Sequence, residues 1–458
     1  MTISKTLTLY AVYKKLPYTV TFNNNNGTST SKIYTSLTMY ASKNQKVTLP
    51  DVPKVKGYTN LGWTTEKGET EPEYSAGDTV KITKATQFYA VRRKSNYYTV
   101  SYYLGNGSTN AAYQKLTQTV EEGTVVTFAK VPARTGYVNQ GWSSKKNSEK
   151  ATAKAKCTVN KNITLYAVQK KAVQLTFHRC DGSTWQKTTL AKGSSYSLPG
   201  VRDAEGYTFM GWSTKPMQSV SPQYEAEEKI TVNGNVDLYA VVFNRTTETD
   251  LTEDQLPQVD IYKYKQVIFV GDSRTEFMEN VLTGMGESAT KNVKFVCSAG
   301  KGLDWFTTTG WAQLYSIVQH DSNSILSKKT AVIFNFGVND LSKSADYAEY
   351  YNWIAPQLKS KGCELYFMSV NPVNRLMLPN AGRADRSEAA VRSFNQYMKA
   401  NLSSAYTYID MYSYLKSTGY SFASDHYGTG TVDDGLHYTT RTYKRIFAKC
   451  MDSLRVPA

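Results

Sequence analysis

Hydrophobic and polar positions follow one pattern in the first half of the chain and another in the second. In residues 1–244, short runs of β-branched and aromatic residues alternate with polar ones and are interrupted by Gly, Asn and Pro. A period of two is typical of half-buried strands in small domains. In residues 264–458 the apolar runs are continuous, which indicates strands buried on both faces. These runs are KQVIFV (265–270), VKFVCS (293–298), AVIFNF (331–336), CELYFMSV (363–370) and YTYIDM (406–411).

Stretches with the composition and length of helices separate those runs. The clearest are RTEFMENVL (274–282), ADYAEYYNWIAPQLKSKG (345–362), RSEAAVRSFNQYMKANL (386–402) and the final TTRTYKRIFAKCM (439–451). Strands that alternate with helices predict a parallel sheet covered by helices on both faces. We therefore expect one α/β domain in the second half.

The first half is repetitive. GYTNLGW (57–63), GYVNQGW (136–142) and GYTFMGW (206–212) are each followed by FYAV or LYAV, whose Tyr lies 24 to 27 residues after the Trp. An isolated LYAV at 9–12 is the tail of an earlier copy, so we expect the chain to begin inside a repeat. A fixed period with strand-like sequence indicates small strand-rich domains in tandem. The Gly-Trp pairs most simply supply a turn and a large core side chain, and a sugar-stacking platform is the alternative.

The repeats and the change of pattern divide the chain into six segments. Residues 245–263 are polar and acidic, and they separate the repeats from the α/β domain. The predicted segments are a truncated repeat (1–16), three full repeats (17–94, 95–171 and 172–244), a linker (245–263) and the α/β domain (264–458).

Charge is unevenly distributed. The chain has a net charge of +16, and residues 1–244 hold 31 of its 54 Lys and Arg but only 16 of its 38 Asp and Glu. A basic surface could bind acidic wall polymers, glycans or nucleic acid, but scattered Lys on β domains is usually a solvated surface, which we favour. No nucleic acid is expected as a partner.

Cysteine usage and hydropathy add two expectations. The five cysteines show no CxxC spacing and are odd in number, so we expect free thiols. No stretch of about 18 apolar residues occurs, so no transmembrane segment is predicted in this chain. The first residues also lack the apolar run of a signal peptide.

Candidate chemistry lies where the predicted strands end. In open α/β sheets, ligands bind at the carboxyl ends of the strands. Ser273 follows the first strand, Gly300 and Gly302 follow the second, Asn339 follows the third, and Asp434 precedes His437 by three residues near the end of the chain. A Ser at a strand-to-helix turn lies at the positive helix end, where backbone N–H groups stabilise an oxyanion.

Each of these residues fits a role in acyl transfer. Ser273 is the candidate nucleophile, His437 the base with a pKa near neutrality, and Asp434 the carboxylate that fixes the tautomer of His437. The N–H of Ser273, the N–H of Gly300 and the Asn339 side chain are candidate oxyanion donors. Gly302 competes with Gly300, which we prefer because it lies closer to the strand.

Every motif also has a structural interpretation. GDS (271–273) could be a helix N-cap, GVND (337–340) a plain turn, and DGLH (434–437) the cap of the final helix. Asp425, His426 and Asp433 together with Asp434 and His437 could ligate a divalent cation, although no metal-ligand spacing is matched. His178 and His320 are expected to be structural. No metal and no cofactor are predicted.

Both halves of the chain resemble known families. Residues 264–458 resemble an SGNH hydrolase of the GDSL esterase/lipase superfamily, on GDS (271–273), Gly300, GVND (337–340) and DGLH (434–437). Residues 1–244 resemble internalin-type B-repeats, also called Listeria–Bacteroides repeats, on the GY and GW motifs with LYAV. The resemblance implies β-grasp-like small α+β repeats followed by an α/β flavodoxin-like three-layer sandwich.

The resemblance also implies the roles assigned above to Ser273, His437, Asp434, Gly300 and Asn339. Asp272, Arg274 and Trp305 are candidate substrate-pocket residues, and packing is the alternative for Trp305 and its neighbour Phe306. We expect a bacterial cell-surface or secreted serine esterase that removes O-acetyl or short acyl groups from glycan or cell-wall material. Its repeats would contact cell wall, glycan or a host surface. The rival hypothesis is a surface adhesin whose SGNH-like domain is not catalytic.

Overall fold

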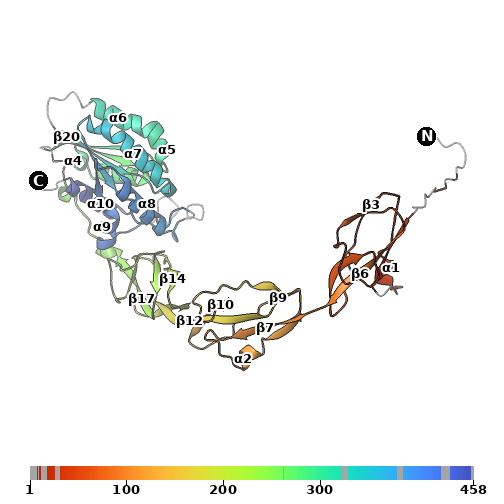
Figure 1. Ribbon diagram of the computed structural model, residues 1–458. Helices are drawn as coiled ribbons and strands as arrows, with labels where there is room; N and C mark the ends of the chain where they lie inside the picture. The colour runs from red at the N-terminus through yellow and green to blue at the C-terminus, as the bar shows by residue number, and fades with distance from the viewer. Residues whose placement is uncertain are drawn as a thin grey trace. The chain divides into compact units, whose positions relative to one another are not determined.

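The structure is a computed structural model, and it describes residues 8, 10–11, 18–25, 31–260, 263–320, 328–378, 385–423 and 434–454. The chain divides into two compact units, residues 1–171 and 172–458. The first unit contains the first two full repeats. The second unit contains the third repeat, the segment after it and the α/β domain (Figure 1).

The first repeat is built on a mixed four-stranded sheet. Its strand order is β2-β1-β6-β4, in which β1 and β6 run parallel and the other pairs antiparallel. A parallel pair formed by the first and last strands is the central feature of a β-grasp-like α+β unit. The elements are β1 (Tyr18–Asn24), α1 (Lys32–Thr35), β2 (Met39–Ala41), β3 (Lys46–Thr48), β4 (Tyr58–Thr64), β5 (Thr79–Lys81) and β6 (Thr86–Lys94).

The second repeat has the same plan. Its last strand, β12, continues into the third repeat: the first part of β12 pairs with β7 and β10, and the later part with β13 and β17. The other elements are β7 (Tyr97–Tyr103), α2 (Ala111–Gln114), β8 (Gln118–Glu121), β9 (Thr124–Thr127), β10 (Tyr137–Ser143), β11 (Lys156–Val159) and β12 (Ile163–His178).

The Trp of each GW motif is a core residue. Trp63 and Trp212 are fully buried, and Trp142 is nearly so. The Trp63 indole N–H donates to Pro50 O at 2.7 Å, which satisfies its polar atom inside the core. The preceding Gly62 has φ +154°, and a Cβ there would lie 2.1 Å from Tyr74 O. The motif therefore serves packing, as the core interpretation predicts.

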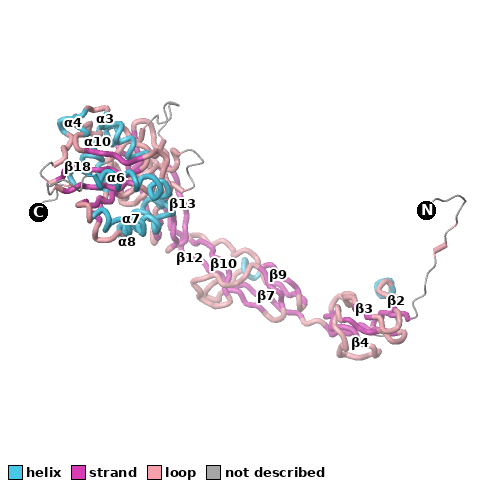
Figure 2. Tube along the Cα trace, turned by 90° about the horizontal axis from the view of Figure 1, so that it is seen from above, coloured by secondary structure: helices cyan, strands magenta, loops and turns pink. Residues whose placement is uncertain are grey.

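The third repeat replaces the short helix by a hairpin. In the first two repeats a one-turn helix links the first strand to its antiparallel neighbour, whereas β13 follows β12 after five residues and pairs with it directly. The elements are β13 (Thr184–Ala191), which is labelled in Figure 2, β14 (Ser194–Ser197), β15 (Tyr207–Ser213), β16 (Lys229–Val232) and β17 (Val236–Asn244).

The α/β domain has a five-stranded parallel sheet of order β19-β18-β20-β21-β22. Numbered within the domain, this order is 2-1-3-4-5, the flavodoxin-like order. The five predicted apolar runs supply these strands, so the parallel α/β core expected from the sequence is confirmed. The strands are β18 (Tyr264–Gly271), β19 (Val293–Cys297), β20 (Lys329–Asn335), β21 (Cys363–Met368) and β22 (Tyr406–Ile409).

Helices cover both faces of that sheet (Figure 1). One core contains Ile268 and Phe334 with side chains of α6, α7 and α8, and the other contains Val267 and Ile333 with side chains of α3, α9 and α10. Successive strand residues thus enter opposite cores, as the pleat requires. The helices are α3 (Ser273–Thr283), α4 (Glu287–Thr290), α5 (Leu303–Trp305), α6 (Trp311–His320), α7 (Ser344–Lys359), α8 (Glu388–Asn401), α9 (Met411–Thr418) and α10 (Thr440–Ser453).

The segment after the third repeat packs onto the α/β domain instead of forming a free linker. Leu256 and Val259 are buried in the core beneath α3 and α10. Glu248 is buried too, where it accepts hydrogen bonds from Ser421 Oγ at 2.5 Å and from Arg445 Nη1 at 2.9 Å. The polar composition of the segment conceals this docking, because the partners of Glu248 lie more than 170 residues away in sequence.

Candidate active site

The candidate site lies at the point where the strand order of the sheet reverses. The chain leaves β18 toward β19 on one side and later reaches β20 on the other, so the carboxyl end of β18 is the switch point at which such sheets bind ligands. Ser273 is the first residue of α3 and follows β18 by one residue. The fold therefore places this hydroxyl where ligands of α/β sheets bind.

Local sequence explains the sharp turn before Ser273. Asp272 is the N-cap of α3, and its carboxylate accepts the Arg274 N–H at 3.0 Å. At Gly271 a Cβ would lie 2.0 Å from Thr275 Oγ1 and 2.8 Å from Asn335 O. Only glycine permits that close approach between the end of β18, α3 and β20. The GDS motif is therefore a helix cap as well, as its structural interpretation predicts.

Ser273, His437 and Asp434 form a hydrogen-bonded line. His437 Nε2 lies 2.8 Å from Ser273 Oγ, and His437 Nδ1 lies 2.6 Å from Asp434 Oδ2. Since a carboxylate only accepts, Nδ1 carries the proton and Nε2 is left to accept from the serine hydroxyl. The His437 side chain is 3% exposed, and Phe277 packs edge-on against its ring at 4.9 Å between centroids.

The turn at 434–437 orients the Asp434 carboxylate. Its Oδ1 accepts the backbone N–H groups of Leu436 at 2.8 Å and His437 at 2.7 Å, which leaves Oδ2 for the imidazole. Burial alone would raise the pKa of Asp434, but the hydrogen bonds from His437 and these backbone groups outweigh it and lower the pKa. The Asp434 carboxylate is therefore an anion at neutral pH.

Arg274 holds the turn at 434–437 in place from inside the domain. It is 2% exposed and donates to three backbone carbonyls: Leu436 O at 3.0 Å, Asn371 O at 3.0 Å and Pro372 O at 2.9 Å. The side chain thus ties the residue before His437 to the loop after β21. Arg274 is a positioning residue, a role that sequence analysis did not assign to it.

The third repeat supports the same turn through Asn374. The Asn374 N–H donates to Gly435 O at 2.8 Å, while its side-chain Nδ2 donates to Asp203 Oδ1 at 2.7 Å and to Val201 O at 3.1 Å. Gly435 has φ +67°, and a Cβ there would lie 2.4 Å from Asn374 O. A chain of hydrogen bonds therefore runs from the third repeat to the residue between Asp434 and Leu436.

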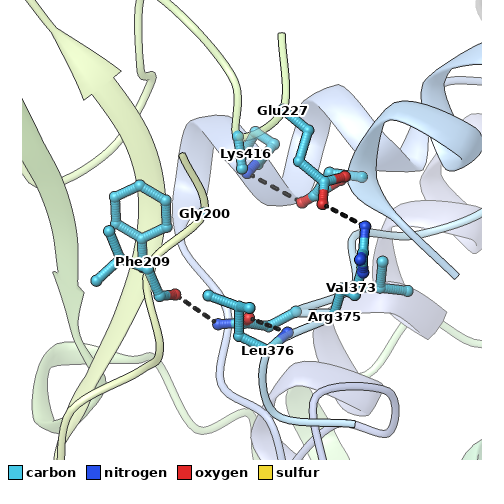
Figure 3. A pocket seen from close by; sticks show the side chains of 11 residues that line it. Gly200, Phe209, Glu227, Val373, Arg375, Leu376 and Lys416 are labelled. Carbon is cyan, nitrogen blue, oxygen red and sulfur yellow. Dashed lines mark hydrogen bonds and ion pairs between the residues drawn. The ribbon is translucent and has the colours of Figure 1, made fainter. Parts of the chain in front are cut away.

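Ion pairs fix that loop and its neighbours against the third repeat (Figure 3). Arg375 Nη1 lies 3.4 Å from Glu227 Oε1. Lys416 is buried between Glu225, at 2.8 Å, and Glu388, at 3.3 Å. Burial would lower the pKa of Lys416, but the two carboxylates outweigh it and raise the pKa, so the ammonium stays charged.

Two of the expected substrate-pocket residues are instead internal. Asp272 is 1% exposed and Arg274 is 2% exposed, and their polar groups face backbone atoms. The expectation that they line a substrate pocket is wrong, because the Asp272 carboxylate caps α3 and the Arg274 guanidinium reaches backbone carbonyls inside the domain. Burial raises the pKa of Asp272 to about 6, against the opposing charge of Arg274.

The candidate oxyanion donors flank Ser273 on neighbouring strand ends. Gly300 follows β19, has φ +69°, and a Cβ there would meet no atom within 4 Å. Among the residues that the structure describes, its N–H has no recorded acceptor. Asn339 follows β20, and its Nδ2 donates to Lys301 O at 2.8 Å. That bond joins the loops that carry Gly300 and Asn339, and one amide hydrogen of Asn339 remains.

Two further residues order these loops. Arg386 Nη2 donates to Asn339 Oδ1 at 2.7 Å, and this leaves the amide nitrogen, not the oxygen, available. Gly302 has a packing role, because a Cβ there would lie 2.4 Å from Asp340 Oδ2, which accepts the Leu303 N–H at 2.9 Å. These contacts favour Gly300 over Gly302 as the open backbone donor. Arg386 was not anticipated, because nothing in its sequence neighbourhood marks it.

The remaining candidates divide between core and surface. Phe306 is fully buried in the core under α7, and Trp305 is half-buried beside Phe336 at 6.1 Å between ring centroids. Packing thus accounts for Phe306, and Trp305 keeps part of its face exposed. His178 contacts Asp237 at 2.9 Å and stacks on Tyr239, a structural environment.

No metal centre occurs in the part of the chain that the structure describes. There, no group of three His, Cys, Asp or Glu side chains is arranged to hold a metal ion. Asp425, His426 and Asp433 of the alternative cation site lie outside the described residues. All five cysteines are free thiols. None of the described helices is long and apolar enough to cross a membrane.

These features define the class of the protein as tandem small α+β repeats followed by an α/β hydrolase-type domain. Residues 267–450 match the family described as GDSL-like lipase/acylhydrolase, and residues 18–91, 98–168 and 174–241 match the Listeria–Bacteroides repeat domain. The C-terminal domain therefore belongs to the GDSL/SGNH hydrolases and the N-terminal domains to the Listeria–Bacteroides repeats. Both resemblances noted in the sequence are confirmed.

Two proteins of Evansella cellulosilytica are similar over about half of the chain. A candidate Gly-rich membrane protein is 28% identical over 237 residues, which are 51% of this chain and 26% of the relative. A candidate membrane protein is 28% identical over 235 residues, 51% of this chain and 33% of the relative. The matched part of the chain thus spans a third or less of the length of each relative.

Three solved structures each cover less than half of this chain. A candidate acylhydrolase of Bacteroides fragilis has a TM-score of 0.31 at 16% identity and covers 44% of this chain and 92% of its own. A candidate SGNH hydrolase of Slackia heliotrinireducens has a TM-score of 0.29 at 12% identity and covers 42% and 100%. An acetyl xylan esterase has a TM-score of 0.29 at 10% identity and covers 41% and 99%.

Proposed function

We propose that the C-terminal domain is a serine esterase that uses Ser273 as nucleophile, His437 as general base and Asp434 as the orienting carboxylate. The observation that carries this proposal is the line of hydrogen bonds from Ser273 Oγ through His437 to Asp434, at 2.8 and 2.6 Å. The first distance is that of a nucleophile and base ready for proton transfer, and the second is that of a base oriented by its carboxylate.

The reaction follows from the positions of these atoms. Ser273 Oγ attacks the carbonyl carbon of the ester while its proton passes to His437 Nε2, and Asp434 stabilises the resulting imidazolium. The negative charge on the carbonyl oxygen is stabilised by the N–H of Ser273 at the start of α3, the N–H of Gly300 and Nδ2 of Asn339. The alcohol leaves with the proton from Nε2, and a water molecule, activated by the same nitrogen, hydrolyses the acyl-enzyme.

Labelling and turnover together test the proposed nucleophile and base. The intact protein should react with a fluorophosphonate probe and hydrolyse p-nitrophenyl acetate, and Ser273→Ala and His437→Ala should each lower kcat by at least about 10³-fold. Ser417→Ala, which removes a surface hydroxyl on α9, is the matched control and should keep full activity. An intact, folded protein that neither labels nor turns over the ester would favour the non-catalytic binding protein instead.

For the substrate we propose O-acetyl or other short acyl esters on glycan or cell-wall material, at the bacterial surface or outside the cell. The support is the combination of a GDSL/SGNH domain with repeats, and the naming of both relatives as membrane proteins. A screen of acetylated polysaccharides, acetylated monosaccharides and long-chain lipid esters tests it. Turnover of the lipids alone would contradict the glycan assignment.

A further inference from the structure

The third repeat has an open cavity at the place where the other repeats are filled. In the first two repeats a tyrosine of the one-turn helix, Tyr34 or Tyr113, is buried against the sheet. The hairpin of the third repeat carries no such helix, and Trp185 of β13 stacks instead on the core Trp212, with ring planes 10° apart and centroids 5.9 Å apart. A cavity of about 210 Å³ remains beside this pair.

The sheet beside the cavity also differs from the sheet of the first repeat. In the first repeat Arg92 Nε donates to Asn60 Oδ1 at 2.8 Å, and the Arg92 guanidinium also bonds the Tyr34 hydroxyl at 2.6 Å. The GYTFMGW and LYAV motifs align these two positions with Phe209 and Val242, both of which line the cavity. Loss of the helix thus coincides with replacement of a polar pair by apolar side chains.

Aromatic side chains and arginines line the cavity. Trp185 is 40% exposed and Tyr207 is 43% exposed, so both side chains offer surface to a ligand in the cavity. Arg179 and Arg202 also line the cavity. The one recorded side-chain hydrogen bond of Arg179 is 3.4 Å long, to Ser183 Oγ, so its guanidinium keeps donors for a ligand.

These features favour a sugar ring over an acyl chain. A pyranose presents a flat C–H face that suits an indole, and it carries hydroxyl groups at its rim. A carboxylate on the ring would pair with a guanidinium in the fork geometry that arginine favours. Arg202 Nη1 already donates to Leu376 O at 2.6 Å. An acyl chain would fill the apolar part of the cavity, but it would desolvate the Arg179 guanidinium without giving it a partner.

We propose that this cavity, lined by Trp185, Tyr207, Phe209, Arg179 and Arg202, binds one carboxylate-bearing pyranose unit of an acidic glycan. The site lies in a domain other than the one proposed to be an esterase, so it does not depend on that activity. The third repeat then holds the glycan, whereas the first two repeats, whose equivalent position is filled by a buried tyrosine, do not.

Calorimetric titration of the full chain tests the proposal. The ligands are trigalacturonate, a hyaluronan tetrasaccharide and a muramic-acid-containing disaccharide, with maltotriose as the neutral sugar and octanoate as the acyl chain. We expect at least one acidic saccharide to bind at least tenfold tighter than maltotriose. Trp185→Ala should weaken that binding tenfold or more. Arg179→Gln, which leaves the core untouched, should weaken it about fivefold and reduce the preference for the acidic sugar.

The controls separate binding from folding and from catalysis. Trp353→Ala removes another exposed tryptophan, on α7, and should leave saccharide binding unchanged. Ser273→Ala should bind as the intact chain does, even if the esterase proposal fails. The inference is overturned if no acidic saccharide binds, if octanoate binds in preference to all of them, or if the Trp185 and Arg179 variants bind as well as the parent.

Discussion

The second and third repeats share their sequence motifs but differ in the burial of one strand. β10 of the second repeat is buried only at its last two residues, Trp142 and Ser143. The corresponding β15 of the third repeat is buried at every residue after Tyr207. A strand that is covered on one face differs in this way from a strand that is covered on both.

Two sequence positions account for the difference in burial between β10 and β15. Gln140 and Lys170 of the second repeat align with Met210 and Phe243 of the third. Met210 and Phe243 lie in the same core as the buried residues of α3 and α10. Phe243 fits against Gly419, where a Cβ would lie 2.3 Å from its ring. The third repeat is therefore part of the same compact unit as the α/β domain, although its motifs are those of the other repeats.

Charged residues extend the comparison. Glu225 and Glu227, which pair with Lys416 and Arg375, occupy positions where the first repeat has Ser75 and Gly77. The domain thus acquired carboxylates on the surface that meets the α/β domain. A tandem repeat can keep its fold while one copy changes its outer face into an interface, because the GW and LYAV residues that define the fold point inward.

Exchange of the two apolar interface residues should have the largest effect. Met210→Gln with Phe243→Lys should destabilise the second unit by about 6 kcal/mol, because it buries an amide and a charge without partners. The reverse exchange, Gln140→Met with Lys170→Phe, alters a solvated face and should change stability by less than about 1 kcal/mol. Urea unfolding followed by fluorescence measures both. Equal effects of the two exchanges would refute the docked role of the third repeat.

Removal of the buried ammonium should have the next largest effect. Lys416→Met leaves Glu225 and Glu388 buried without their cation, and should cost about 3–5 kcal/mol of unfolding free energy. Lys343 pairs with Asp304 at 2.9 Å on the surface, so Lys343→Met should cost no more than about 1 kcal/mol. Thermal unfolding compares the two variants. A cost for Lys416→Met as small as the surface value would mean that this interface is hydrated and weak.

A smaller effect is expected on turnover when the link between the third repeat and the turn at 434–437 is cut. Asn374→Ala removes the hydrogen bonds to Asp203 and Val201, and should lower kcat about tenfold by loosening the turn that carries His437, with KM changed less than about twofold. Asn352→Ala is the matched control, because Asn352 clamps Asn401 and Ser403 in the same way at the far side of the domain. Unchanged kcat for Asn374→Ala would limit the third repeat to a structural role.

The smallest effect should be a change in the pH dependence of stability. Burial raises the pKa of Glu225, although Lys416 opposes it. The folded unit therefore binds the proton of the Glu225 carboxyl more tightly than the unfolded chain does. The contribution of Glu225 to folding stability is complete below its unfolded pKa of about 4.3 and is lost as the pH rises through its folded pKa. Glu225→Gln should flatten this fall in Tm between pH 4 and 7. A curve parallel to that of the parent would contradict the raised pKa.

Much of the α/β domain could be predicted because its signals are local. Each predicted apolar run became a strand with ends shifted by two residues or fewer, since a buried parallel strand needs a continuous apolar sequence. α9 was not predicted, because it is short. Asn374 follows the fourth strand, so the strand-end rule that selected Ser273 and Asn339 would also have selected it had it been applied there. Arg386 carries no such signal.

The sequence by itself determined the repeats, the parallel sheet and the order of the residues proposed for catalysis, because periodicity and motifs are properties of neighbouring residues. Only the tertiary structure decided that His437 meets Ser273 from 164 positions away, and that Arg274 faces inward to hold the turn of His437. It also decided that the third repeat joins the compact unit that contains the α/β domain. These outcomes depend on which distant surfaces bury each other, and a linear pattern does not contain that information.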